Sequence, residues 1–383
     1  MMTTRLCYEV DFLSVGKDQD GDAIVLRWGR NEPGFWGYYE PVCNKNSLIE
    51  QKVVVIDTGF TSDGERIRYH INTYYKVDTV DLIIITHPDL DHIGGLNYIL
   101  ENMDVKELWI HRPSLHRKGV QVDDGRVTEN SKTKRLRECK AKIEEAIGIA
   151  KEKGIIIKEP FQGLNFNDEN GSILVLAPTK EDYESLLPEF IGEKSLNFSE
   201  NTKEKVKIPI TLYNDEDDLD DKDTTSAVNK SSTVILFCCD NDYSLFTGDS
   251  GIGTLERAYE YLTRSHNYNY FLNNLKLFQI PHHGSKRNLG PSILNKLFPE
   301  WRDYSYIRDY SYISAVISCA KKNDTDVTLK HPHQAVINAF RRRNINVYAT
   351  AGLNFVHHKN MPGREGWWPA ISLVKKPLYY EER

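Results

Sequence analysis

Long apolar runs and paired cysteines are both missing from this sequence. No stretch approaches the roughly 18 consecutive apolar residues of a membrane-spanning helix, and the first residues lack the apolar core of a secretory signal. The 6 cysteines show no CxxC spacing, so neither a disulfide framework nor a cysteine zinc site is indicated. We therefore expect a soluble, cytoplasmic protein with reduced thiols and no membrane partner.

A strong charge of either sign is missing as well. The 49 Lys and Arg residues and the 55 Asp and Glu residues give a formal net charge of −6, which does not favour tight, electrostatically driven binding to nucleic acid. A hydrophobic fraction of 40% is ordinary for a globular protein and excludes a disordered or fibrous chain. The 383 residues suffice for several average domains or for one large domain with insertions.

The hydrophobic pattern alternates between the periods of strands and helices. Residues 53–56 and 82–85 are compact apolar runs of the kind that form buried strands. Helical spacing follows at 93–100, a strand is predicted at 105–110, and a longer helix is predicted over 131–153. The order of strand, loop, helix and strand indicates an α/β protein whose loops carry the polar chemistry.

Two charged segments stand out from this pattern. Lys and Arg occupy positions 132, 134, 135, 137 and 140 of the long helix, a face that is usually only solvated and that alternatively contacts a substrate backbone. The acidic run at 215–223 lies in a stretch without periodicity and lacks the ligand spacing of a calcium loop. We expect this run to be an exposed, mobile loop.

Four side chains that can bind metal lie together on one loop, between the strand at 82–85 and the helix that follows it. They are His87, Asp89, Asp91 and His92. Imidazole nitrogen and carboxylate oxygen are zinc ligands, and carboxylates also suit harder ions such as manganese. Without a metal, two carboxylates and two imidazoles would crowd together with no neutralising partner. The pattern therefore predicts a metal-binding loop.

Two further strand ends carry the same ligand types. Asp249 follows a predicted strand at 243–246, and His282 and His283 follow another at 275–280. Each of these shorter pieces would be a weak signal by itself. Together with the first loop, they predict one metal cluster that draws on three loops.

In this order and at these strand ends, the motifs resemble those of metallo-β-lactamase-fold hydrolases, and within them the branch that contains the soluble domain of ComEC competence proteins. The matching segments are 12–23, 56–59, 86–95, 231–236, 246–249, 280–285, 331–333 and 347–355. The resemblance implies an α/β four-layer αββα sandwich with a two-metal site at one edge of its facing sheets. It also implies a single domain over 1–383, with insertions at about 112–170 and 181–230 in which specificity would reside.

The resemblance assigns roles to the predicted ligands. One ion would be held by His87 and Asp89, and the other by Asp91 and His92. Asp249 would bridge the two ions.

The resemblance also separates the two adjacent histidines. His283 is favoured as a ligand of the second ion, and His282 as a group that faces the substrate. Asp57 follows the buried strand at 53–56 and matches an aspartate that organises the metal loop through hydrogen bonds.

Two departures from the family pattern affect the metal. Asp89 stands where many members have histidine, which hardens the ligand set and leaves both zinc and manganese open as the metal. We find no counterpart of the histidine that usually follows the strand before Pro178. The first ion would then have fewer protein ligands, or would be helped by His111 or His116.

The implied chemistry is attack by a metal-activated hydroxide. Two ions would lower the pKa of a bound water and stabilise the developing oxyanion. Asp91 could accept a proton while it binds metal, and His282 or His331 could protonate or stabilise the leaving oxygen. His333 lies in the same segment as His331, and its alternative role is to cap a loop.

The function that the resemblance favours is hydrolysis of a phosphodiester in DNA or RNA. Lys286 and Arg287 directly follow the adjacent histidines and would contact phosphates of such a substrate. A first alternative is a hydrolase of small phosphodiesters or acyl esters, because one fold supports many substrates. A second is a metal-stabilised effector or interaction module with little activity. A protein partner is left open.

Overall fold

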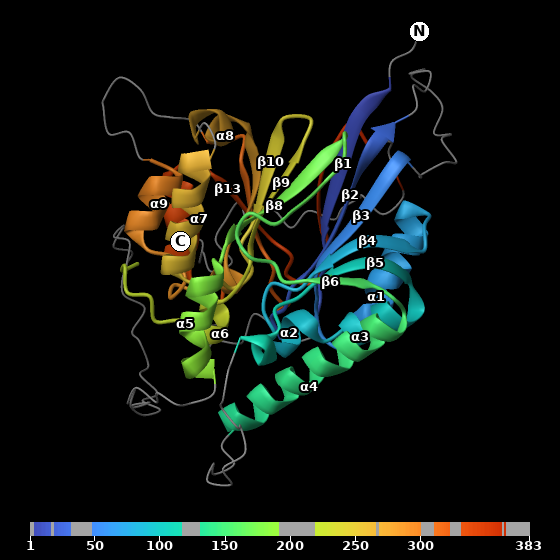
Figure 1. The fold of residues 1–383 in the computed structure, drawn as a ribbon. Helices are drawn as coiled ribbons and strands as arrows, with labels where there is room; N and C mark the ends of the chain where they lie inside the picture. The colour runs from blue at the N-terminus through green and yellow to red at the C-terminus, as the bar shows by residue number, and fades with distance from the viewer. Residues whose placement is uncertain are drawn as a thin grey trace.

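Two seven-stranded sheets face each other and helices cover their outer sides (Figure 1). The structure, a computed structural model, describes residues 4–16, 19–31, 48–116, 131–190, 219–265, 268–299, 310–321, 331–361 and 364. Helix, sheet, sheet and helix form the four layers that the sequence predicted.

The first sheet has the strand order β14-β1-β2-β3-β4-β5-β6. Its strands are β1 (Arg5–Phe12), β2 (Ala23–Asn31), β3 (Ile49–Thr58), β4 (Thr79–Ile84), β5 (Asp104–Trp109), β6 (Ile156–Lys158) and β14 (Phe355–Lys359). From β14 to β3 the neighbours are antiparallel, and from β3 to β6 they are parallel. Because parallel strands need crossover connections, helices lie between these last strands along the chain.

The helices of this half follow the parallel strands. They are α1 (Asp63–His70) with the helical turn η1 (Ile71–Tyr75), α2 (Leu90–Ile93), α3 (Leu96–Asn102), the short turn η2 (Pro113–Leu115) and α4 (Ser131–Glu152). The helix predicted over 93–100 is therefore divided at Gly94 and Gly95. An added Cβ on either glycine would come within 2.6 Å of backbone atoms, so the close packing at this point requires residues without a Cβ.

The second sheet has the order β13-β12-β11-β10-β9-β8-β7 and is also mixed. Its strands are β7 (Asn165–Asn167), β8 (Gly171–Ala177), β9 (Val234–Cys239), β10 (Asp242–Phe246), β11 (Leu275–Gln279), β12 (Ser314–Ile317) and β13 (Asn346–Ala349). Strands β7 to β10 are antiparallel neighbours, and β10 to β13 are parallel.

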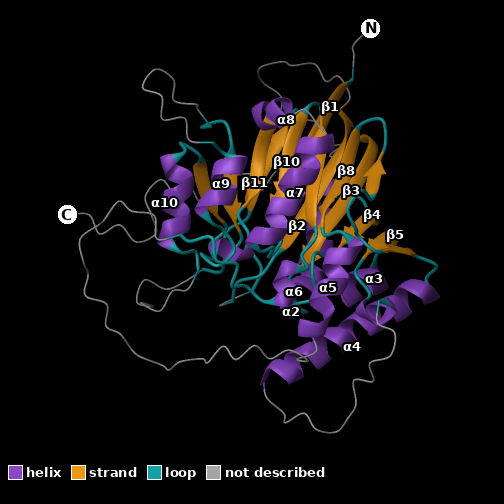
Figure 2. Cartoon of the chain, turned by 60° about the vertical axis from the view of Figure 1, so that its left-hand side comes forward, coloured by secondary structure: helices purple, strands orange, loops and turns teal. Residues whose placement is uncertain are grey.

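The helices of the second half cover the outer face of this sheet (Figures 1 and 2). They are α5 (Lys180–Phe190), α6 (Ala227–Lys230), α7 (Ile252–Ser265), α8 (Tyr268–Asn274), the turn η3 (His282–Gly284), α9 (Pro291–Leu297) and α10 (Gln334–Arg342). In the described ranges, no helix is both long enough and apolar enough to cross a membrane.

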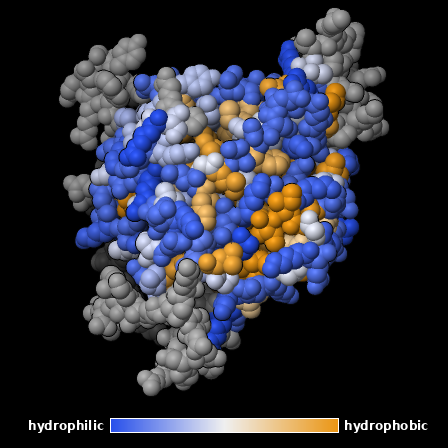
Figure 3. All heavy atoms as spheres, in the orientation of Figure 1, coloured by the Kyte–Doolittle hydropathy of each residue, from blue (hydrophilic) through white to orange (hydrophobic). Residues whose placement is uncertain are grey.

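The core consists of three apolar layers that follow from the period of the strands. In β2, Ile24 and Leu26 pack between the two sheets, whereas Ala23 and Val25 face the helices α1, α3 and α4. A third layer fills the space between the second sheet and α7 to α10. The surface seen in Figure 3 is mainly hydrophilic, with apolar side chains gathered in a few places.

The second half of the acidic run at 215–223, predicted as an exposed, mobile loop, is exposed at residues 220–222 but is bonded to the starts of two helices. Residues 215–218 lie outside the described residues. Asp221 accepts hydrogen bonds from the backbone N–H (3.0 Å) and hydroxyl (2.6 Å) of Ser292 at the start of α9, and Asp223 accepts one from the N–H of Gly253 (3.0 Å) at the start of α7. Carboxylates are favourable there because the first N–H groups of a helix lack partners within it.

The basic positions of the long helix are only partly described. Side chains at 132, 134 and 135 lie outside the described residues. Arg137 and Lys140 are exposed on α4.

Candidate metal centre

The predicted ligands gather at one end of the two sheets, near α2 and α6, which lie below the strands in Figure 1. His87 to His92 occupy the loop after β4 and the start of α2, Asp249 follows β10, and His282 and His283 form the turn after β11. The ends of strands from both sheets therefore supply the side chains, and the three loops meet in one cluster.

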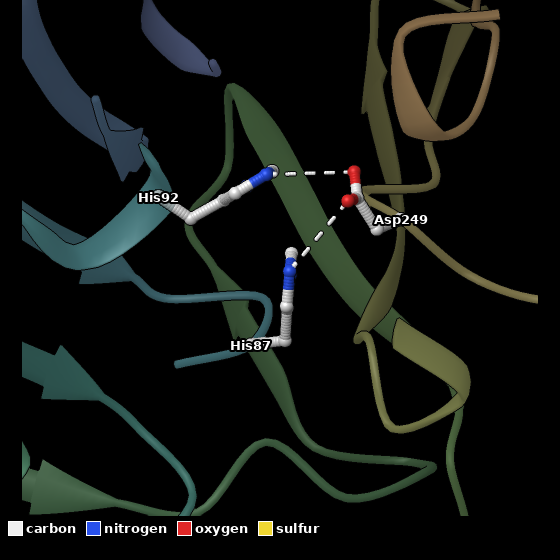
Figure 4. A group of neighbouring side chains, drawn as sticks. All are labelled: His87, His92 and Asp249. Carbon is white, nitrogen blue, oxygen red and sulfur yellow. Dashed lines mark ion pairs between the residues drawn. The ribbon is translucent and has the colours of Figure 1, made fainter. Parts of the chain in front are cut away.

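Asp249 lies between two histidines of the first loop. Its Oδ2 is 3.7 Å from Nε2 of His87, and its Oδ1 is 3.4 Å from Nε2 of His92. Figure 4 shows the two imidazole rings pointing at the carboxylate, each toward a different oxygen. A carboxylate that offers one oxygen to each of two positions can bridge two cations.

The second of these positions is completed by Asp91 and His283. Oδ2 of Asp91 is 3.7 Å from Nε2 of His283 and 3.9 Å from Nε2 of His92. These three ligand atoms lie within 4.8 Å of one another. A cation among them would be within reach of one carboxylate and two imidazoles.

The other position lies beside Oδ2 of Asp249. Asp89 Oδ2 is 3.8 Å from Nε2 of His87. His282 Nε2 is 3.5 Å from Oδ2 of Asp249. The two histidines of the turn η3, His282 and His283, therefore face different carboxylates of the cluster.

The ring nitrogens of three histidines are divided between anchoring and facing the cluster. The Nδ1 atom of His87 lies 3.1 Å from Oγ1 of Thr86. The Nδ1 atom of His92 lies 2.8 Å from Oδ2 of Asp57. The Nδ1 atom of His283 lies 2.9 Å from the carbonyl oxygen of Ser318. The Nε2 atoms of all three, and Oδ1 of Asp249, are buried without a hydrogen-bond partner in the described structure. A buried polar atom without a hydrogen-bond partner destabilises the folded protein. Several such nitrogen and oxygen atoms that face one another are the arrangement expected of ligands to a metal ion.

Comparison with known proteins agrees with this geometry. Residues 46–179 match the family model described as the metallo-beta-lactamase superfamily, a stretch that includes the first loop but neither Asp249 nor the adjacent histidines. ComE operon protein 3 of Bacillus subtilis (strain 168) is 24% identical over 390 residues, which cover 96% of this chain. By this match residues 46–179 belong to the metallo-beta-lactamase superfamily, and the two facing sheets have the fold of that superfamily.

The relationship to the Bacillus protein is distant homology, and the chain spans 37% of the length of that relative. Among solved structures, a metallo-beta-lactamase with a HARLDQ motif from Cronobacter sakazakii is 10% identical, with a TM-score of 0.30 over 70% of this chain and 73% of that one. A mutant of it gives a TM-score of 0.29 and 10% identity, over 70% and 75% of the two chains.

Members of the metallo-beta-lactamase superfamily are typically metal-dependent hydrolases. In this chain, the charges of the clustered carboxylates and imidazoles favour the binding of a cation. Burial opposes ionisation of Asp249, but the surrounding imidazoles, His282 first, lower the pKa of its carboxyl. Burial likewise opposes charging of His283, but the contact with Asp91 raises its pKa to about 10. Burial next to His92 lowers the pKa of His87 to about 3. Cation and proton thus compete for the same buried carboxylates and imidazoles.

Asp57 stabilises the metal loop of this metallo-beta-lactamase fold through hydrogen bonds. It is buried at the end of β3 with a φ of +57°, and its carboxylate accepts hydrogen bonds from the backbone N–H (2.8 Å) and hydroxyl (2.7 Å) of Thr86. The same carboxylate contacts Nδ1 of His92. These contacts fix the start of the loop and the orientation of a ligand ring.

The remaining predicted residues surround the cluster. Lys286 and Arg287 are exposed just after the turn η3. The ring of His331 lies 5.4 Å from that of His282, centre to centre. His333 caps α10, because its Nδ1 accepts a hydrogen bond from the N–H of Ala335, so the structure supports the capping alternative.

His111 and His116, the candidate helper ligands, make their contacts with other residues. His111 is buried against the ring of Tyr183, and its Nε2 lies 3.3 Å from the hydroxyl of Thr233. His116 lies between Glu159 and Glu184, at 2.8 Å and 2.9 Å. Both therefore belong to a neighbouring packed region.

Sequence reasoning missed several polar residues that support the site. Gln279 donates from Nε2 to Oδ2 of Asp22 and accepts, at Oε1, from the N–H groups of Thr247 and Gly248 just before the bridging carboxylate. Asp22 also lies 3.8 Å from Nδ1 of His92. Asp22 stands within a segment that carried the resemblance, but Gln279 is 257 residues away, so only the fold reveals the pair.

Proposed function

We propose that this chain is a metal-dependent phosphodiesterase that acts as a nuclease on DNA or RNA through two divalent ions, zinc or manganese. The observation that carries the proposal is the convergence of bare, buried Nε2 atoms of His87, His92 and His283 on the carboxylates around Asp249. A folded protein keeps such atoms unpaired at a cost that bound cations remove.

The ligands divide between two ions on either side of Asp249. His87 and Asp89 would hold the first ion with Oδ2 of the bridging carboxylate, which lies 3.7 Å from the ring of His87. Asp91, His92 and His283 would hold the second with Oδ1. A pair of cations bridged by one carboxylate is the arrangement used for in-line displacement at phosphorus.

The ligand set and its surroundings favour a phosphodiester substrate. Three carboxylates harden the site relative to an all-histidine one and suit metals that bind phosphoryl oxygens. Lys286 and Arg287 are exposed next to the turn that carries His282 and His283, where they can contact neighbouring phosphates of a polymer. The competence-protein branch that the motifs resemble is linked to nuclease activity.

Each part of the site has a distinct task in this proposal. When bound, the ions supply an activated hydroxide and stabilise charge on the phosphoryl oxygens. Asp91, whose side chain is 18% exposed, accepts the proton of the attacking water. His331, beside His282 and outside the ligand set, protonates the leaving oxygen. Asp57 keeps the ring of His92 in the orientation that directs Nε2 at the cluster.

A substrate panel tests the proposal. The full chain, loaded with zinc, manganese or magnesium, is compared on plasmid, single-stranded and double-stranded DNA and RNA against bis-p-nitrophenyl phosphate, phosphocholine esters and cyclic nucleotides. We expect cleavage of nucleic acid that weakens as salt rises, because the protein grips several phosphates. Replacement of both Lys286 and Arg287 by Glu should weaken polymer cleavage and leave small-ester turnover and metal content unchanged.

The matched control is Asp249→Asn, which keeps the side-chain volume but removes the bridging charge. It should lose metal and all activity together. Turnover of small esters with every nucleic acid left intact would instead support the small-molecule hydrolase. Bound metal without any turnover would support the effector module.

A further inference from the structure

The first ion lacks one protein ligand if only the expected residues bind it. Strand β8 ends at Ala177, and residues 171–180 contain no histidine, so the ligand that usually follows this strand is absent. His87, Asp89 and Asp249 remain on that side of the cluster. A catalytic zinc ion usually has three protein ligands and one open position, and a structural one has four, so these three residues leave room for one further donor.

His282 points its Nε2 at this position. The atom is 3.5 Å from Oδ2 of Asp249, the same oxygen that faces Nε2 of His87 at 3.7 Å. The Nε2 atoms of His87 and His282 thus both face the same carboxylate oxygen. His283 faces Asp91 instead, so the two neighbours in sequence serve different sides of the cluster.

An unusual backbone makes this division possible. His282 has a φ of +49° and His283 a φ of +53°, both in the left-handed region that residues other than glycine rarely adopt. The turn is held by hydrogen bonds from the N–H of His282 to the carbonyl of Gly248 and from the N–H of His333 to the carbonyl of Gly284. Strain of this kind persists where a functional geometry requires it.

Asn288 determines which nitrogen of His282 carries the proton. Its amide nitrogen donates to the carbonyl oxygens of Asp249 (2.8 Å) and Ser250 (3.1 Å), which can only accept, so the orientation of the amide is fixed. Its Oδ1 therefore faces Nδ1 of His282 at 2.9 Å and accepts the proton of that nitrogen. The other nitrogen, Nε2, is left with a lone pair directed at the cluster.

Asn229 does not compete for that lone pair. Its amide nitrogen is 3.2 Å from Nδ1 and 3.4 Å from Nε2 of His282. An atom nearly equidistant from both ring nitrogens lies against the ring between them, and not in line with either lone pair.

We propose that His282 is the missing ligand of the first ion, and that Asn288 is the positioning residue that fixes its Nδ1–H tautomer. The turn η3 would then supply one histidine to each ion. His282, which the resemblance favoured as a group that faces the substrate, then becomes part of the metal site. His331 remains as the neighbouring imidazole outside the ligand set. The inference rests on the two-ion site of the proposed function and not on its substrate.

Metal binding by the full chain tests the inference independently of activity. Zinc content is measured after dialysis against a competing chelator, and cobalt is added to follow the absorption of each site. Wild-type protein should hold two ions. His282→Ala should retain the second ion and bind the first at least about tenfold more weakly, and added imidazole should restore it. His331→Ala, the control for loss of a nearby imidazole, should retain both ions.

Asn288→Ala provides a second variant that leaves every ligand in place. It should weaken the first ion by roughly ten- to a hundredfold, as loss of a partner to a ligating histidine does. The nitrogen chemical shifts of His282 in zinc-loaded protein should show a protonated Nδ1 and a metal-bound Nε2. Two ions held as tightly in folded His282→Ala as in the wild type would overturn the inference but not the proposed function. A wild-type chain that binds no metal would overturn both.

Discussion

Three of the metal-facing histidines, His87, His92 and His283, use their two ring nitrogens for different purposes. One nitrogen is anchored to a hydroxyl, a carboxylate or a backbone carbonyl, and the other is bare and buried. The anchor sets the tautomer and the direction of the ring, so affinity for a metal depends on residues that never touch it. Among these anchors, Asp57 serves the ring of His92 and also the backbone of the metal loop.

Asp57→Asn should therefore weaken metal binding without removing a ligand. The amide can replace the carboxylate in volume, but it carries no charge and can present an N–H where Nδ1 of His92 donates. We expect a loss of metal affinity of roughly ten- to a hundredfold, with the same number of ions bound at saturation. Chelator competition measures this change. An affinity equal to that of the wild type would show that Thr86 alone positions the loop.

His111 should make the stability of the fold depend on pH. Burial lowers its pKa from 6.5 to about 3, so the folded state holds it neutral while the unfolded chain binds a proton below pH 6.5. The stability that depends on neutral His111 is thus present above pH 6.5 and is lost as the pH falls toward about 3.

The variant His111→Gln isolates this contribution. Glutamine does not titrate and its amide can still reach the hydroxyl of Thr233. The free energy of unfolding should fall with decreasing pH less steeply in the variant, by up to about 1.4 kcal/mol per pH unit below pH 6.5. Urea unfolding at a series of pH values measures the two slopes. Parallel curves would mean that His111 is protonated in the folded protein.

At the scale of secondary-structure elements, backbone atoms pack closely around α2. The sequence pattern did not indicate this packing, and a substitution at Gly94 tests it. Gly94 stands between α2 and α3, where a Cβ would lie 2.6 Å from the carbonyl of Leu90 and from the backbone of Phe60 and Thr61. Gly94→Ala should therefore shift the metal loop. We expect it to destabilise the protein by roughly 1–3 kcal/mol, as overpacking does, and to lower metal affinity.

Gly148→Ala on α4 is the matched control. A Cβ at this position would meet nothing within 4 Å, so the only effect should be the higher helix propensity of alanine. Stability should rise by roughly 0.5–1 kcal/mol with metal affinity unchanged. Denaturant unfolding and zinc titration of both variants measure the contrast. Equal stability of Gly94→Ala and the wild type would mean that the facing loop yields easily.

The strands and the ligand loops were accessible from the sequence because their signals are local. Apolar runs at 53–56 and 82–85 lie within β3 and β4, and ligand types stand directly after β4, β10 and β11. The supporting contacts were not accessible, because they join segments distant in sequence or, for Asn288 and His282, because they depend on the conformation of a turn. No local pattern indicates that Gln279 bonds Asp22, or that Asn288 orients His282.

The contacts of the acidic run at 215–223 were also not accessible from the sequence. Its composition is typical of a solvated loop, yet Asp221 and Asp223 bond the first turns of α9 and α7. Capping of this kind depends on where a distant helix begins, which charge and periodicity do not reveal.

At the scale of the whole molecule, the metal centre joins the two halves of the sandwich. The first loop follows a strand of one sheet, whereas Asp249 and the adjacent histidines follow strands of the other. In the described structure, Gln279 and Asp22 also connect the halves next to the cluster. Bound cations would therefore stabilise the packing of sheet on sheet and not only the local loops.

Removal of metal should lower the thermal stability of the entire fold in one transition. A ligand that binds only the folded state contributes RT ln(1 + [L]/Kd), about 2.7 kcal/mol at a hundredfold excess over Kd. Calorimetry with zinc and with chelator should show a higher Tm for the loaded protein and a single peak in both. Asp249→Asn, which cannot join the halves through metal, should have a Tm that hardly responds to chelator. Two separate transitions in the metal-free wild type would show instead that each sheet with its helices folds independently, and that only the ions couple them.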